Sequence, residues 1–230
     1  MKDTVQSKPP KDVKEGAPSC GLYFSMPDDV PLEQANRMIR EAAFVINRSS
    51  YERNMNVLEL GAGIGDAEAL ERLVTLVAVG RREGMVVIIR NDAELAKDAE
   101  ADGVILDDPD ALAAAREMVG PDGIMGLRCG LSRASAEKAL ALEVDYVSFH
   151  AAAHHLLPPE SLISWWSVKT DIPCLVEGGL TNDDCARYVR AGATFVEASF
   201  YVWDHPQGIK QGTVDMLYAI DLAMENITFQ

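Results

Sequence analysis

Long apolar segments are missing from this chain of 230 residues. No run approaches the roughly 20 residues that a membrane-spanning helix needs, so an integral membrane protein is not expected. Cysteines are few and scattered (Cys20, Cys129, Cys174 and Cys185), with no C-x-x-C pair among them. Because the N-terminus also lacks a hydrophobic signal core, we expect a cytoplasmic protein whose thiols stay reduced.

Basic residues are scarce as well. Lysine and arginine number 21 against 36 aspartates and glutamates, which gives a formal net charge of −15 and a sequence pI of about 4.6. A field of this sign repels nucleic acids and anionic membrane surfaces. We therefore expect neither as a partner.

The first 18 residues differ in composition from the rest of the chain. They contain three prolines, four lysines and almost no apolar side chains, so they cannot offset the entropy lost on ordering. We expect a disordered tail over residues 1–18 and one folded domain over residues 19–230.

Beyond the tail, short apolar runs alternate with longer segments of helical period, which is typical of β/α units around a parallel sheet. The runs predict strands at 21–25, 56–60, 85–90, 103–106, 124–128, 146–150, 173–177 and 194–198. The other segments predict helices at 32–45, 66–83, 93–99, 109–119, 133–142, 159–168, 182–191 and 212–226. Eight strands, each followed by a helix, predict an α/β fold with a single (β/α)8 TIM barrel, and an open doubly wound sheet is the alternative.

Barrels of this class place their active sites at the carboxyl ends of the strands, and the loops after the last two strands often bind phosphate. Gly178 and Gly179 follow the seventh predicted strand, and their N–H groups can approach an anion without hindrance from a Cβ atom. Ala198 and Ser199 follow in the same way at the eighth. These four residues predict a phosphate site, and the alternative is that the glycines only make a tight turn.

Oxygen donors follow the third and fourth predicted strands. Asn91, Asp92 and Asp110 lie on adjacent loops, and carboxylate and amide oxygens are ligands that Mg²⁺ accepts. The alternative is that Asp92 caps a helix and Asp110 interacts with a helix dipole.

Three of the four histidines fall together after the sixth predicted strand, at His150, His154 and His155. His150 is placed to act as a general acid or base. The alternative is an ordinary surface loop with incidental histidines.

Several segments resemble one known family: IIRNDAELAKDAEADGVILDDPDAL, GPDGIMGLR, LEVDYVSF, IPCLVEGGLTNDD and AGATFVEAS. This succession resembles the thiamine-phosphate synthase/TenI superfamily, whose members are single (β/α)8 barrels. The resemblance implies a Mg²⁺-dependent enzyme that joins a pyrimidine diphosphate to a thiazole phosphate and releases pyrophosphate. It also implies that Asp92, in an asparagine-aspartate pair with Asn91, holds the metal with Asp110, and that Gly179 and Ser199 hold the thiazole phosphate.

The sequence departs from the family at positions that carry charge. Where the family has a cationic diphosphate-binding motif after the second strand, this chain has Glu59 and Gly61, and Arg128 stands at the serine position after the fifth strand. Arg128 can replace a missing cation as a bidentate phosphate ligand, and we assign it a catalytic role beside His150. Glu59 and Glu177 contribute to an acidic mouth, which suits a divalent cation and disfavours a polyanionic substrate.

Three functions remain open at this point. The first is thiamine-phosphate synthase-like transfer, with a phosphorylated small molecule as substrate. The second is a non-catalytic paralogue that still binds phosphate. The third is a TenI-like isomerase of a phosphorylated heterocycle, with His150 carrying the proton. Trp165 and Trp166 lie on a predicted outward-facing helix, where they can pack or contact a second copy, so a homo-oligomer is also open.

Overall fold

A computed structural model describes residues 20–49, 55–61, 67–153 and 156–228. The expected tail over 1–18 lies outside these residues, as do His154 and His155. No helix in these four ranges is long and apolar enough to cross a membrane. All four cysteines are described, and each is a buried free thiol.

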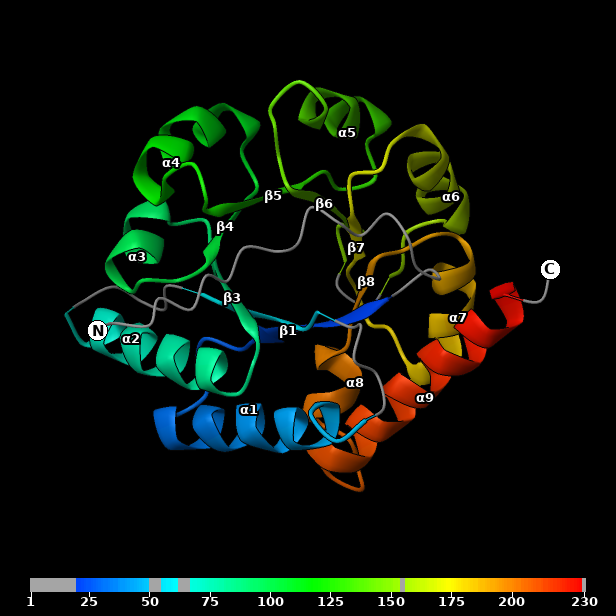
Figure 1. Ribbon diagram of the computed structural model, residues 1–230, viewed down its shortest axis with the longest axis horizontal. Helices are drawn as coiled ribbons and strands as arrows, with labels where there is room; N and C mark the ends of the chain where they lie inside the picture. The colour runs from blue at the N-terminus through cyan, green and yellow to red at the C-terminus, as the bar shows by residue number, and fades with distance from the viewer. Residues whose placement is uncertain (1–19, 50–54, 62–66, 154–155, 229–230) are drawn as a thin grey trace, which may run out of the picture.

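The predicted barrel is confirmed. The strands pair in parallel in the order β1-β2-β3-β4-β5-β6-β7-β8, and β8 closes onto β1. Figure 1 shows the strands at the centre of a ring of helices. The strands are β1 (Gly21–Met26), β2 (Val57–Leu60), β3 (Val86–Arg90), β4 (Gly103–Leu106), β5 (Ile124–Arg128), β6 (Tyr146–Phe149), β7 (Cys174–Val176) and β8 (Phe195–Glu197). The helices are α1 (Leu32–Ile46), α2 (Ala67–Arg82), α3 (Ala93–Asp98), α4 (Leu112–Val119), α5 (Arg133–Ala139), α6 (Glu160–Lys169), α7 (Asn182–Arg190), α8 (Ser199–Trp203) and α9 (Ile209–Thr228), and a 3₁₀ turn at Pro109–Ala111 precedes α4.

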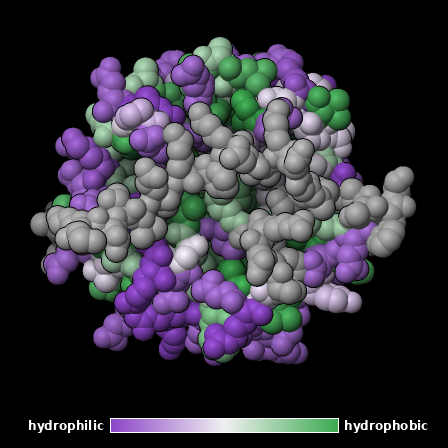
Figure 2. All heavy atoms as spheres, in the orientation of Figure 1, coloured by the Kyte–Doolittle hydropathy of each residue, from purple (hydrophilic) through white to green (hydrophobic). Residues whose placement is uncertain are grey.

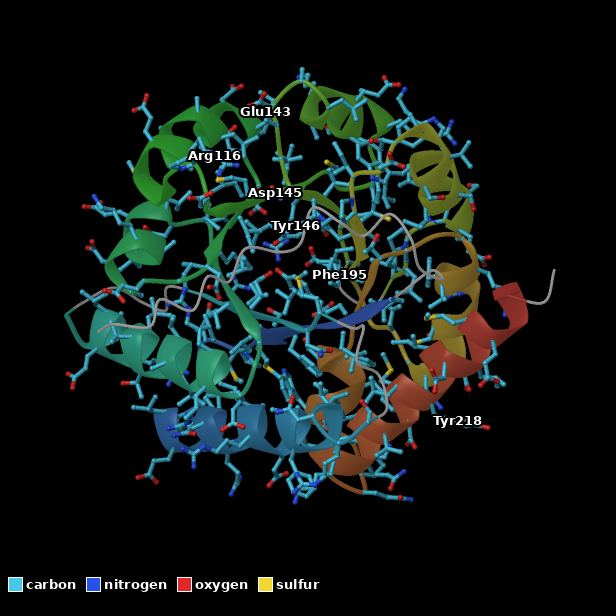
Figure 3. All side chains as sticks on the ribbon, viewed as in Figure 1. Arg116, Glu143, Asp145, Tyr146, Phe195 and Tyr218 are labelled. Atoms are coloured by element: carbon cyan, nitrogen blue, oxygen red, sulfur yellow. The ribbon has the colours of Figure 1, made fainter. Side chains whose placement is uncertain are left out.

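The alternation of side chains along each strand divides the core into two layers. One set of side chains packs outward against the helices and forms the larger apolar cluster. The other set points into the barrel and forms a smaller cluster, which includes Val57, Ile88 and Leu175. Figure 3 shows Tyr146 and Phe195 of this inner cluster near the centre of the ring, whereas Tyr218 points away from the molecule on α9.

Several boundaries differ by a few residues from those predicted, and the short helix α8 was not predicted. The eighth strand was expected to run to residue 198, but it ends at Glu197, and the short helix α8 begins at Ser199. The aromatic and β-branched residues of α8 favour a strand locally. Tertiary contacts override that preference, since the Ala198 N–H donates to the Tyr23 carbonyl (2.8 Å) and the Val202 N–H then donates back to the Ala198 carbonyl. The last helix begins at Ile209, earlier than expected.

Hydrophilic side chains cover much of the outer surface in view. Figure 2 shows hydrophilic residues gathered over the lower part of the face in view, where α1 lies.

Candidate functional site

A cavity of about 1110 Å³ opens at the carboxyl ends of the strands. Four of the predicted site residues are among its described lining: Arg128, His150, Gly178 and Ser199. The other charged residues of the lining are Asp28, Arg90, Asp107, Glu177, Glu197 and Asp204. Two guanidinium groups therefore face five carboxylates, and the predicted acidic mouth is present.

Arg128, the last residue of β5, lies at the centre of an ion-pair network. Its Nε donates to Glu177 Oε1 (3.0 Å) and its Nη2 donates to Glu59 Oε2 (2.5 Å). Its Nη1 lies 3.6 Å from Asp107 Oδ1 at the rim. Burial lowers the pKa of the guanidinium, but the carboxylates of Glu177 and Glu59 outweigh burial and raise it. Arg128 is thus held as a cation that links three strands.

Glu59, at the base of this network on β2, has a side chain that is 0% exposed. Burial raises the pKa of its carboxyl, while Arg128 and the hydrogen bond from Tyr23 act in the opposite direction. The Tyr23 hydroxyl donates to Glu59 Oε2 at 2.7 Å. Ser148, on β6, donates to Glu177 in the same way. These bonds fix the rotamers of both carboxylates, so the base of the cavity is pre-organised.

A second guanidinium, that of Arg90, lies beside Gly61 after β2. Arg90 Nη2, from β3, lies 2.3 Å from the point that a Cβ on Gly61 would occupy, and Asp28 Oδ1 lies 2.0 Å from it. Arg90 Nη2 also donates to Asp28 Oδ1 (2.8 Å), and its Nη1 lies 3.4 Å from Glu59. Glycine at position 61 therefore makes room for a cation that the neighbouring strand supplies.

Glu197, the last residue of β8, is half-buried, and no ion pair of the described residues neutralises its carboxyl group. Burial and the nearby Glu177 raise its pKa to about 7, although hydrogen bonds from Gly178 and Ser199 oppose the rise. A carboxyl with such a pKa changes its charge near neutral pH, which is a property of residues that bind or transfer protons.

The residues predicted to bind phosphate already donate to other groups. The Gly178 N–H donates to Glu197 Oε2 (3.0 Å), and the Ala198 N–H donates to the Tyr23 carbonyl. Ser199 accepts the Ser25 N–H at its Oγ (2.6 Å). Gly178 has φ of 143°, and a Cβ there would lie 2.7 Å from the Leu156 carbonyl oxygen, so only glycine fits. Gly179 follows in the same loop, before α7.

The residues predicted to hold a metal lie at the β3–β4 side, outside the described lining of the cavity. Asp92 Oδ1 accepts the Leu95 N–H (2.9 Å) and caps α3. This confirms the alternative prediction that Asp92 caps a helix. Asn91 is hydrogen-bonded to Asp107 through its amide (2.7 Å), and Asp110 is exposed on the 3₁₀ turn. Within the described ranges, no three histidine, cysteine, aspartate or glutamate side chains gather closely enough to form a metal cluster.

His150 lies directly after β6 and lines the cavity. Its backbone N–H donates to the Gly130 carbonyl (3.3 Å). Its Nδ1 is buried and has no hydrogen-bond partner among the described residues. The ring is thus positioned for a polar contact that a bound ligand could make.

Comparison with known proteins identifies the family. A family model described as thiamine monophosphate synthase matches residues 53–199, well over half of the chain. The chain belongs to the thiamine monophosphate synthase family. The match extends from just before β2 to the start of α8, so it includes the carboxyl ends of all strands except β1.

Individual members of the thiamine monophosphate synthase family are similar over most of their length. The thiamine-phosphate synthase of Methylobacillus flagellatus is 31% identical over 194 residues, which are 81% of this chain and 88% of that protein. That of Erythrobacter litoralis is 33% identical over 150 residues, 61% of this chain and 70% of that protein. The structure of thiamine phosphate pyrophosphorylase from Pyrococcus furiosus superposes with a TM-score of 0.73 at 17% identity, covering 88% of this chain and 96% of that one. This last likeness supports the fold.

Sequence reasoning missed Glu197 and Arg90 as cavity residues. A signal for Glu197 was present, since Phe195 and Glu197 are two residues apart on β8 and so share a face. Phe195 is an apolar inward-facing residue, and a glutamate on the same face must therefore also enter the barrel. Arg90 ends a buried strand and offered a similar signal.

Proposed function

We propose that the chain is an enzyme of thiamine biosynthesis, a transferase that joins a pyrimidine diphosphate to a thiazole with Mg²⁺. The family match over residues 53–199 carries this proposal, because the matched segment includes seven of the eight strand ends around the cavity. In the reaction, the thiazole ring nitrogen attacks the methylene carbon of the pyrimidine. The bond from that carbon to the diphosphate oxygen breaks, the diphosphate leaves with the electron pair, and the nitrogen becomes quaternary and positively charged.

The side chains of the cavity support this transfer by position and by charge. Arg90 and Arg128 lie on the sides of β3 and β5 that face the cavity, where guanidinium groups can stabilise charge on a departing diphosphate. Asp28, the partner of Arg90, is 46% exposed, so that ion pair can exchange for a ligand at little cost. The rigid base around Glu59 and Ser148 holds the ligand pocket in one shape, which favours an aligned approach of the two reactants.

The donor chemistry at β3 and β4 fits Mg²⁺. Asp92 and Asp110 would provide carboxylate oxygens, and Mg²⁺ is commonly held by one or two carboxylates together with water and substrate phosphates. Oδ1 of Asp92 caps α3. No described residue is hydrogen-bonded to its Oδ2, so this oxygen is left for a ligand. Bound there, the ion would neutralise part of the charge on the diphosphate.

The test is incubation of the purified protein with the pyrimidine diphosphate, Mg²⁺ and the thiazole, supplied once as its phosphate and once as its alcohol. We expect a thiazolium product and inorganic diphosphate, detected by mass spectrometry, from at least one acceptor. An Arg90→Gln variant should lower kcat more than it raises KM for the thiazole, because the guanidinium acts on the leaving group. Absence of product from both acceptors, with the protein folded, would overturn the proposal in favour of a non-catalytic binding paralogue.

The unpartnered Nδ1 of His150 favours a second candidate, an isomerase acting on a heterocycle by proton transfer. In that case the wild type should exchange a carbon-bound proton of the thiazole phosphate with deuterium from solvent, followed by NMR. His150→Asn should abolish exchange, and exchange that persists in the variant would rule this candidate out.

A further inference from the structure

Two of the residues predicted to hold a phosphate at the ends of β7 and β8, Gly178 and Ser199, interact with a carboxyl group of the chain itself. The Gly178 N–H donates to Glu197 Oε2 at 3.0 Å, and the Ser199 side chain also hydrogen-bonds to Glu197. Glu197 is half-buried and belongs to a barrel strand, so its position does not depend on a loop. A carboxyl group of the chain therefore lies where a phosphate was expected.

The neighbouring hydrogen bonds show that most of the predicted phosphate donors already have partners within the protein. Ser199 Oγ accepts the Ser25 N–H at 2.6 Å, which leaves its hydroxyl proton to donate to Glu197. Tyr23 pairs with Glu197 in the β1–β8 register, and its carbonyl takes the Ala198 N–H. Three of the four predicted phosphate donors are therefore engaged. Gly179 is next to Gly178 in the chain, so an anion bound by its N–H would lie close to the Glu197 carboxylate.

No ion pair of the described residues joins a cation of the cavity to Glu197, and in the proposed reaction Arg90 and Arg128 serve the diphosphate. Arg128 is paired with Glu177 and Glu59, and Arg90 is paired with Asp28 and Glu59. Within the described residues no other lysine or arginine lines the cavity. A phosphate beside Glu197 would thus meet a like charge inside the cavity, where repulsion is screened less than in bulk solvent.

We propose that the Glu197 carboxylate replaces the phosphate of the ligand, so that the cavity selects a thiazole ending in a neutral hydroxyl over its phosphate ester. A hydroxyl can donate a hydrogen bond to the carboxylate, whereas a phosphate oxygen would be repelled by it. This inference rests on the proposed function only for the identity of the heterocycle. The transfer reaction would then yield a thiazolium alcohol that carries no phosphate.

The selection should depend on pH. The pKa of Glu197 is raised to about 7, so the carboxylate is largely charged at pH 8 and largely neutral at pH 6. Discrimination against the phosphate ester should accordingly weaken as the pH falls. The titratable and charged groups that face the same cavity or underlie it are Glu177, Glu59, Arg128, Arg90, Tyr23, Tyr146, His150, Asp28, Asp107 and Asp204.

The test measures binding of the thiazole alcohol and of the thiazole phosphate by isothermal titration calorimetry at pH 6 and at pH 8. We expect the wild type to bind the alcohol about tenfold more tightly than the phosphate at pH 8, given a like-charge contact inside the cavity. The ligand phosphate has its own pKa near 6, so its titration must be separated from that of Glu197. The Glu197→Gln variant supplies this baseline, since only the ligand titrates in it.

Three variants separate the effect of the charge of Glu197 from the effect of its size. Glu197→Gln removes the charge, and its amide oxygen can still accept the Gly178 N–H, so the preference for the alcohol should fall by about tenfold while the fold is kept. Glu197→Ala also frees the donors and should bind the phosphate more tightly than the alcohol. The matched control is Asp204→Asn, which removes an exposed carboxylate from the rim of the same cavity and should leave the preference unchanged.

The outcomes are distinct from those of the proposed function. Tighter binding of the phosphate by the wild type at pH 8, or an unchanged preference in Glu197→Gln, would overturn the inference even if the protein forms a thiazolium product. Conversely, a Glu197-dependent preference in a protein that forms no product would support the inference and reject the transferase. Equal loss of preference in Asp204→Asn would also overturn it, because the effect would then be one of net charge.

Discussion

The two ends of the barrel interior are built on opposite principles. The end nearer the start of the strands is filled by apolar side chains such as Val57, Ile88 and Ile105, with a small cavity of about 90 Å³ among them. The end at which the strands finish is filled by charges, with Arg128 between Glu59 and Glu177. At the first end, each apolar side chain stabilises the fold through its own burial, independently of the others. At the second, Arg128, Glu59 and Glu177 are tolerated because each has a partner of opposite charge.

The largest expected effect comes from removing the central cation of the charged end. Arg128→Met leaves Glu59 and Glu177 buried without a guanidinium, and we expect a loss of about 3–5 kcal/mol in the free energy of unfolding. Urea denaturation measures the change. Adding Glu59→Gln and Glu177→Gln to the same chain should restore part of the stability, because the unpaired charges are then gone.

The apolar end provides the control for this prediction. Leu175→Ala should cost about 2–5 kcal/mol, a similar amount, but through a cavity and lost burial. Its effect should add to that of any substitution in the charged network that it does not contact. If the change in the free energy of unfolding for Arg128→Met combined with the two glutamine substitutions equals the sum of the single changes, the charged end is no more interdependent than the apolar one.

A second, smaller difference between the two ends is their response to pH. The pKa of Glu197 is raised from 4.5 to about 7 in the folded protein, so the folded state binds more protons than the unfolded state between these values. Stability from this group is present below the unfolded pKa and is lost as the pH rises through the folded one. Glu197→Gln should therefore gain about 3 kcal/mol relative to the wild type between pH 4 and pH 8.

Denaturation series at several pH values check this result. Leu175→Ala, measured alongside, should show the same difference from the wild type at every pH. A difference between Glu197→Gln and the wild type that is constant with pH would show that folding does not shift the pKa of Glu197.

The contrast between the two ends also explains how far the sequence could be read. The apolar end follows from the alternation within single strands, and this local signal predicted all eight strands. Arg128 and Glu177 were recognised as rim residues. Their ion pair was not, because it joins positions 49 residues apart, at the end of β5 and just after β7, and depends on barrel closure. Glu197 was missed because the residues after it matched a phosphate pattern.

The smallest expected effect concerns Asp92, which lies outside both ends of the interior and carries two predicted roles. As the cap of α3 its side chain accepts the Leu95 N–H, and Asp92→Ala should cost about 1 kcal/mol in the free energy of unfolding. Serine caps a helix nearly as well as aspartate but offers no carboxylate, so Asp92→Ser should retain most of the stability. If Asp92 also holds Mg²⁺, the increase in Tm that Mg²⁺ and diphosphate together give the wild type should be lost in both variants. An increase in Tm that survives in Asp92→Ser would mean that Asp92 only caps α3. The metal would then be bound by other groups.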